Sequence, residues 1–78
     1  MDIKEKITEV FRMTFGDKTI VLSNEMTSQD IEGWDSLSHM IMIERIETEF
    51  SIKFKLKDLN KLKNVGALLE MVKIKIEE

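Results

Sequence analysis

The sequence predicts an all-α fold: a bundle of three longer helices and one short helix, with a long loop between the first two. Apolar residues recur at helical spacing near both ends of the chain. Between them, the run 37–50 contains neither glycine nor proline. Apolar residues make up 42% and charged residues 35% of the chain, a balance typical of a folded helical domain rather than a disordered tail.

The length of 78 residues predicts one domain, residues 1–78, with a single modest core. The absence of cysteine excludes disulfides and cysteine-based metal sites. No apolar run approaches the roughly 20 residues that span a bilayer, so we expect no transmembrane segment. The first five residues do not resemble a signal peptide, and we therefore expect a cytoplasmic protein.

The first helix is predicted over Asp2–Phe15. Asp2 is a suitable N-cap, and Gly16 is a natural helix stop. Spacings of three and four residues place a stripe of apolar side chains on one face, which we expect to face the core. This stripe consists of Ile3, Ile7, Val10, Phe11 and Phe15.

A long connection is predicted over Asp17–Asp35, polar but with isolated apolar residues that we expect to pack on the helices. Thr19–Leu22 and Ser51–Lys57 have some strand character, but a lone two-stranded ribbon is only marginally stable. We therefore expect extended segments there. The acidic residues of the loop do not match the spacing of a calcium-binding loop.

The second helix is predicted over Ser36–Phe50. Stepping 100° per residue gives it one buried face and an opposite side with exposed apolar residues. The buried face comprises His39, Met42, Ile43, Ile46 and Phe50. Leu37 and Ile41 lie opposite, and Met40 lies at the margin.

A short third helix is predicted over Asp58–Leu62, and its shortness predicts few fixed contacts and easy local opening. A fourth helix is predicted to start after Asn64 as N-cap. Its inner face is expected to comprise Val65, Leu68, Leu69, Val72 and Ile76. Ile74 points outward on the same wheel.

Ser36 is the main candidate for chemistry. It follows Gly33 at the start of the second helix, where free amide groups and the helix dipole favour a phosphate. The alternative is that Ser36 only caps the helix. Counted from Ser36 as the cap, position N3 is His39, so no capping box is predicted.

The motif Asp35-Ser36-Leu37, with Gly33 two residues before it, resembles the attachment motif of the acyl carrier protein family. The resemblance covers almost the whole chain. It includes the long loop before the motif, the acidic helix ending at 47–50, the short third helix and Asn64-Val65-Gly66 at the start of the last helix.

The resemblance implies 4'-phosphopantetheine attached to Ser36 by a phosphopantetheinyl transferase, with Asp35 as a contact that positions the incoming cofactor. The thiol of this arm would carry acyl intermediates as thioesters in fatty-acid, polyketide or related specialised biosynthesis. Such a protein is a carrier and not an enzyme, and we expect a monomer. Acyl-loading and acyl-processing enzymes would dock on the second helix, at Leu37, Met40, Ile41, Glu44 and Glu47.

The sequence departs from fatty-acid carriers in having Trp34 in place of a small residue, and fewer acids on the second helix. These departures indicate a specialised free-standing carrier, for example in polyketide-like, aminoacyl or polysaccharide-modifying pathways. The region 25–49 has seven acids and one base, a local net charge of −6 (1 − 7), so we expect no nucleic-acid partner. An unmodified helical interaction module remains an alternative. A Ser36–His39 hydrolase is disfavoured, because no third residue or oxyanion hole completes it.

Overall fold

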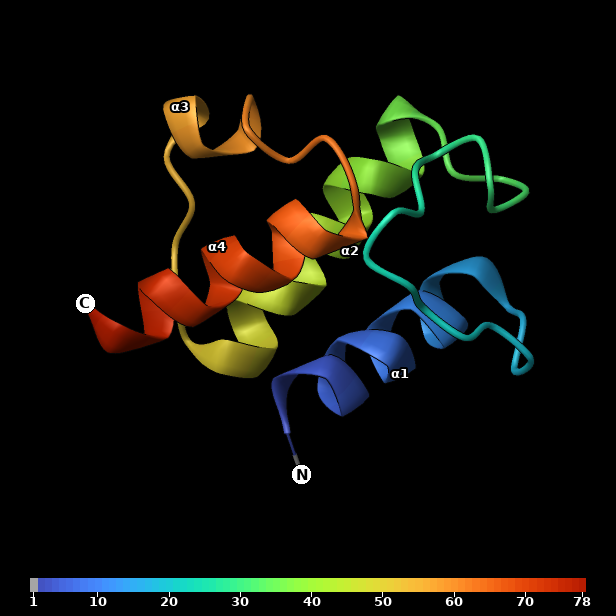
Figure 1. The fold of residues 1–78 in the computed structure, drawn as a ribbon, viewed down its shortest axis with the longest axis horizontal. Coiled ribbons are helices and arrows are strands. Elements are labelled where there is room, and N and C mark those ends of the chain that lie inside the picture. The colour runs from blue at the N-terminus through green and yellow to red at the C-terminus, as the bar shows by residue number, and fades with distance from the viewer. Residues whose placement is uncertain (1) are drawn as a thin grey trace.

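The computed structural model describes residues 2–78, which form four helices and no strand (Figure 1). The helices are α1 (Ile3–Phe15), α2 (Ser36–Phe50), α3 (Leu56–Leu59) and α4 (Val65–Glu77). α1 packs against both α2 and α4, while α3 lies at one edge of the bundle. The all-α prediction is therefore confirmed. The extended interpretation of Ser51–Lys57 holds only in part, because Ser51 is left-handed and Leu56 and Lys57 belong to α3.

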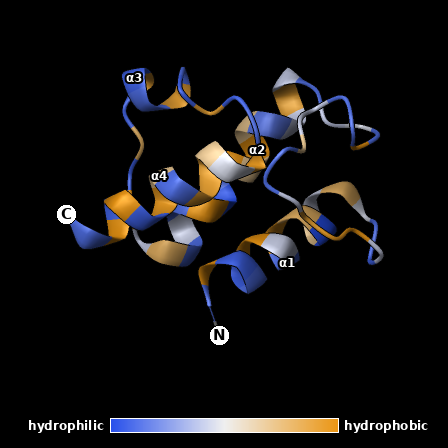
Figure 2. Cartoon of the chain, in the orientation of Figure 1, coloured by the Kyte–Doolittle hydropathy of each residue, from blue (hydrophilic) through white to orange (hydrophobic). Residues whose placement is uncertain are grey.

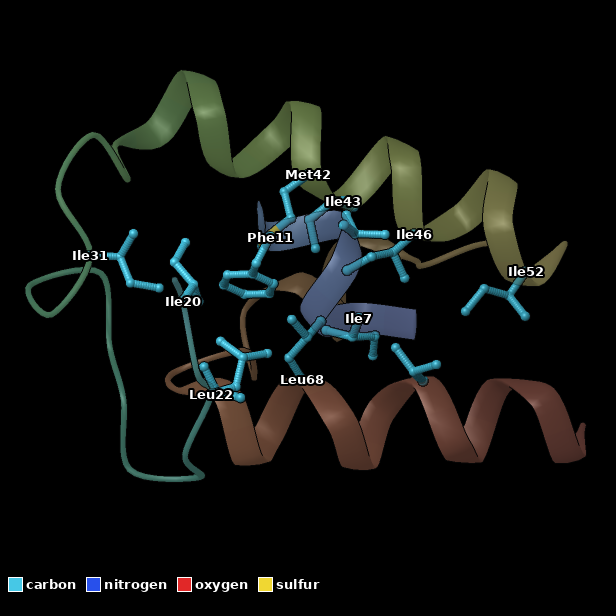
Figure 3. Close-up of a cluster of buried hydrophobic side chains, with 13 residues drawn as sticks. Ile7, Phe11, Ile20, Leu22, Ile31, Met42, Ile43, Ile46, Ile52 and Leu68 are labelled. Atoms are coloured by element: carbon cyan, nitrogen blue, oxygen red, sulfur yellow. The ribbon is translucent and has the colours of Figure 1, made fainter. Parts of the chain in front are cut away.

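The core lies where the three long helices meet, and it is closed by residues from the loops. Figure 3 shows Phe11 and Ile7 of α1 between the buried residues of α2 and those of α4. Ile20, Leu22 and Ile31 of the long loop are also buried. Each long helix carries apolar and polar residues on different sides (Figure 2). The loop after α1 thus contributes to the core as predicted, although Val21 is exposed.

The long loop is fixed to the N-terminus of α4 by backbone hydrogen bonds. The amide of Val65 donates to the carbonyl oxygen of Met26, and the amide of Gly66 donates to that of Asn24, both at 2.9 Å. These amides belong to the first turn of α4, where no intrahelical acceptor exists. The Asn64 side chain accepts from Ala67 at 2.8 Å, which confirms Asn64 as the N-cap.

Replacing Gly66 with alanine should destabilise the protein, although alanine is the better helix former. A Cβ at this position would lie 3.0 Å from Asn24 Cβ and 3.1 Å from its carbonyl oxygen. That oxygen accepts from Gly66 and cannot retreat without weakening the bond. Overpacking costs about 1–3 kcal/mol and outweighs a gain of about 1 kcal/mol from helix propensity. We expect a net loss of about 1 kcal/mol in urea unfolding.

The control for this prediction removes the other side of the contact. In an Asn24→Gly background, the Cβ and Cγ atoms near Gly66 are absent. The added methyl group should therefore cost less there than in the parent chain. An increase in stability for Gly66→Ala alone would contradict the close approach.

The third helix begins and ends earlier than predicted. It covers Leu56–Leu59 instead of Asp58–Leu62, because the Asp58 carboxylate accepts from the amide of Lys55 at 2.8 Å and fixes the first turn. Leu56 is 77% exposed and does not reach the core, whereas Ile52 is buried. The strand-like pattern of this segment therefore did not predict correctly that Leu56 is exposed.

The third helix makes few contacts with the other helices, as predicted, and a buried ion pair is the contact that joins it to α4. The ammonium group of Lys75 lies 2.8 Å from the Asp58 carboxylate, and both side chains are at most 10% exposed. Lys75 also lies 3.3 Å from the carboxylate of Glu78. This ion pair therefore fixes one point of α3 to α4.

The inner face of α4 is shorter than predicted. Val65, Leu68 and Val72 are buried, but Ile76 is 43% exposed, similar to the outward-pointing Ile74 at 46%. The C-terminal end of α4 reaches the edge of the bundle, where few neighbours remain to cover its last turn (Figure 1). The core contribution of this helix therefore ends near Val72.

Candidate functional site

Ser36 is the first residue of α2 and not its cap. The N-cap is Asp35, whose carboxylate accepts from the amide of Ser38 at 2.9 Å. Its carbonyl oxygen accepts the first helical hydrogen bond, from His39, also at 2.9 Å. The alternative that Ser36 serves as the helix cap is therefore wrong, because the preceding residue takes that role.

A capping box is present, contrary to the sequence-based prediction. The amide of Asp35 donates to Ser38 Oγ at 2.8 Å, and the same hydroxyl donates to the carbonyl oxygen of Gly33 at 2.8 Å. Gly33 has a φ of +88°, a conformation that glycine adopts without strain. The backbone and side-chain hydrogen bonds of Ser38 lower the pKa of the Asp35 carboxyl. These contacts fix the backbone on both sides of Ser36.

The hydroxyl of Ser36 is left free by this arrangement. The side chain is exposed, and its oxygen has no hydrogen-bond partner within the part of the chain that the structure describes. It lies in the first turn of α2, where amide groups point toward an approaching anion. Ser36 can therefore be modified without breaking any contact that holds the helix start.

A groove of about 340 Å³ adjoins Ser36. It lies between the start of α2, the long loop and the segment that precedes α4. Its lining residues include two groups that can donate to an anion, Lys63 and His39. The full lining is Ser28, Trp34, Asp35, Ser36, His39, Met40, Leu62 and Lys63.

Trp34 and His39 form a pair on one wall of this groove. The indole Nε1 donates to His39 Nδ1 at 3.1 Å, and the two rings are nearly parallel, at 18°. Trp34 also meets Phe11 edge-on, with ring centroids 5.2 Å apart. His39 was expected on the buried face of the second helix, but it is only half-buried and lines this groove. Its bond with Trp34 had no signal in the sequence.

The residues expected to form a docking surface do not all face the same way. Leu37, Met40 and Ile41 are 72%, 50% and 41% exposed, which confirms the exposed apolar positions on α2. Met40 lines the groove beside Ser36. Ile41 and Glu44 instead line a second groove, between α2 and α1, of about 470 Å³. Two adjacent surfaces of α2 are thus exposed.

The three glutamates of α2 have different surroundings. Glu47 is half-buried, and its carboxylate accepts from the amide of Phe54 at 2.8 Å, so it holds the segment after α2. Glu49 lies 3.7 Å from the ammonium group of Lys6. Glu44 is exposed and has no ion pair within residues 2–78. It is therefore the acid of α2 that is most available to a partner.

The fold and this site define a class of protein: a small helical carrier whose exposed serine, at the start of its central helix, adjoins an open groove. Clusters of side chains suited to a metal ion are absent from residues 2–78. None of the helices in this range has the length and apolarity needed to cross a membrane.

Comparisons with known proteins agree with this class. The sequence matches the family described as "Phosphopantetheine attachment site" over residues 5–72. The structure is similar to the solution NMR structure of a holo acyl carrier protein from Geobacter metallireducens, with a TM-score of 0.92 and 45% sequence identity. That similarity covers 99% of this chain and 88% of the other. A search of curated proteins finds no match.

The chain belongs to the acyl carrier protein family. It is a carrier and not an enzyme, and the cofactor of this family is covalently attached 4'-phosphopantetheine. The site suits that group, because a free hydroxyl, the N-terminal turn of a 15-residue helix and a lysine lie around one groove. When bound, the cofactor supplies a thiol that holds an acyl group as a thioester.

Proposed function

We propose that Ser36 is the residue to which phosphopantetheine is attached, and that the chain serves a specialised acyl-transfer pathway. The observation that carries the attachment site is the hydroxyl of Ser36, exposed and without a protein partner at a rigidly capped helix start. Ser28 lines the same groove, but it belongs to the loop and has no helix N-terminus behind it.

The covalent step joins Ser36 Oγ to the phosphorus of the phosphopantetheine group of coenzyme A. The bond from that phosphorus to the adenosine bisphosphate breaks, and the hydroxyl proton is released. Asp35 has two roles in this proposal. Its hydrogen bond with Ser38 places Ser36, and its exposed carboxylate is a contact for the transferase.

The partners are enzymes that load, process or unload an acyl or aminoacyl group. We propose that they dock on Leu37, Met40, Ile41 and Glu44, with apolar contacts as the larger part. Glu47 has a smaller part in docking, because its carboxylate already accepts from Phe54. Fewer free acids on α2 favour a dedicated pathway, polyketide-like or aminoacyl, over general fatty-acid synthesis. A cytoplasmic location and a monomeric state belong to the same proposal.

The test of the attachment site is the intact mass after incubation with coenzyme A, magnesium and a broad-specificity phosphopantetheinyl transferase. We expect the parent chain to gain one phosphopantetheine group and Ser36→Ala to gain none. The matched control is Ser28→Ala, which removes a serine from the same groove and should load fully. Circular dichroism should show the same helix content in all three.

Two results would overturn the assignment. Loading of Ser36→Ala would place the arm on another residue. Failure of the folded parent chain to load with several transferases would favour an unmodified interaction module that keeps only the fold.

A further inference from the structure

The Trp34–His39 pair determines which nitrogen of His39 carries a proton. The indole nitrogen of Trp34 is only a donor, so His39 Nδ1, at 3.1 Å, must accept through its lone pair. In the neutral imidazole the proton then resides on Nε2. Burial lowers the pKa of His39, which favours this neutral form near pH 7.

The Nε2 atom of His39 is open to the groove. Within residues 2–78 it has no hydrogen-bond partner. In the same range, Thr14 Oγ1 is a buried side-chain atom without a partner, whereas His39 Nε2 is not fully buried. Solvent therefore reaches Nε2. The solvent-filled space that His39 lines is the groove beside Ser36. His39 therefore brings an unused N–H donor to the groove that Ser36 also lines.

Position on the helix places this donor close to Ser36. Residues three apart lie on the same face of a helix, with Cβ atoms about 5–6 Å apart. A phosphate bound to Ser36 Oγ would lie in the space between the side chains of Ser36 and His39. The charged residues that line the groove are Asp35 and Lys63. Asp35 repels an anion and Lys63 attracts it. The phosphate on Ser36 is therefore favoured on the side of His39 and Lys63, away from the Asp35 cap.

We propose that His39, held in its Nε2–H form by Trp34, binds the phosphodiester attached to Ser36 and thereby positions the cofactor arm along the groove. Lys63, in the segment that precedes α4, provides the opposite charge in the same groove. This inference rests on attachment at Ser36. His39 and Trp34 are positioning residues, because the chemistry takes place at the far end of the arm.

The test compares the parent chain before and after loading, with complete loading verified by intact mass. Two-bond ¹H–¹⁵N spectra of the imidazole should show the Nε2–H form of His39 in the unloaded chain. Loading should raise the pKa of His39 by about 1 pH unit, because an adjacent anion favours the imidazolium. A phosphodiester does not titrate near neutral pH. Its ³¹P resonance should therefore change with the midpoint of the His39 titration only if the phosphate lies against His39.

Variants separate this role from a purely structural one. In His39→Gln the amide nitrogen can replace Nε2, and the ³¹P shift at pH 7 should stay close to that of the parent. In His39→Asn the amide can accept from Trp34 but is too short to replace Nε2, so the ³¹P shift should move. Lys63→Met should raise the pKa of His39 in the loaded chain further, while Lys61→Met, outside the groove, should not.

The outcomes distinguish this inference from the proposed function. If Ser36 does not load, the proposed function fails before His39 is measured. If Ser36 loads but the pKa of His39 does not change on loading, the inference is overturned. It is also overturned if the ³¹P resonance of the loaded chain does not change as His39 titrates. The comparison of unloaded and loaded parent chain requires no variant, so it decides the matter even if a substitution unfolds the protein.

Discussion

Replacing Phe11 with alanine is expected to lower the free energy of unfolding by about 3–5 kcal/mol. Phe11 is fully buried, and it packs against Trp34 and against Phe15, whose ring centroid is 5.9 Å away. A domain of this size has a total stability of about 4–12 kcal/mol. The variant should therefore lose a large part of this stability, as measured by urea unfolding followed by circular dichroism.

Met13, on the same helix, provides the control for this prediction. Its side chain is 70% exposed, so Met13→Ala should change stability by no more than about 0.5 kcal/mol. A loss of less than about 1 kcal/mol in Phe11→Ala would show that the aromatic cluster can collapse around the cavity. In that case Phe11 would not be the residue that supports Trp34.

Acid should remove the contact that fastens α3 to α4. The hydrogen bond from Lys75, followed by that from the amide of Lys55, lowers the pKa of the Asp58 carboxyl below its ordinary value. In the unfolded chain this carboxyl titrates near about 3.9, so the unfolded state binds the proton first as the pH falls. The stabilisation is thus present above that pH and is lost as the pH falls through the lower folded-state pKa of Asp58.

The same pair has a limit on the alkaline side. The hydrogen bond with Asp58 raises the pKa of Lys75. Its contribution is therefore complete below the unfolded-state pKa of about 10.4 and is lost as the pH rises through the higher folded-state value. Urea midpoints measured across this range should form a plateau between the two limits.

Asp58→Asn isolates the ion pair from the other carboxylates. It leaves the ammonium group of Lys75 nearly buried without its main partner, so the urea midpoint at pH 7 should fall. Adding Lys75→Met removes the unpaired charge and should restore part of the loss. Glu78→Gln removes only the exposed partner and should have little effect. An unchanged midpoint in Asp58→Asn would refute the role of this pair.

The long helices could be predicted from the sequence because each carries a periodic apolar face. The predicted bounds of the second helix, 36–50, agree with those of α2, and Met42, Ile43 and Ile46 are buried as expected. The error at its start was the identity of the cap. Asp35 and Ser36 are both suitable cap residues, and only the hydrogen bonds to Ser38 decide between them.

The features that the sequence did not reveal depend on residues far apart in the chain. Asp58 and Lys75 are separated by a loop and most of a helix, so no local pattern predicts their contact. Nothing in the sequence distinguishes Lys63 from the other lysines of residues 53–63, and its position in the groove depends on where α4 begins. Trp34 and His39 are near in sequence, but their bond requires the turn made by the capping box.

The position of Trp34 gives the molecule an internal optical reporter. It is the one tryptophan in the sequence, and its indole contacts the core through Phe11 and the groove through His39. Its fluorescence emission therefore depends on the packing of the core. It also depends on the protonation of His39, because a protonated imidazole quenches indole fluorescence. Folding and occupancy of the groove can be followed through a single chromophore, without labelling the chain.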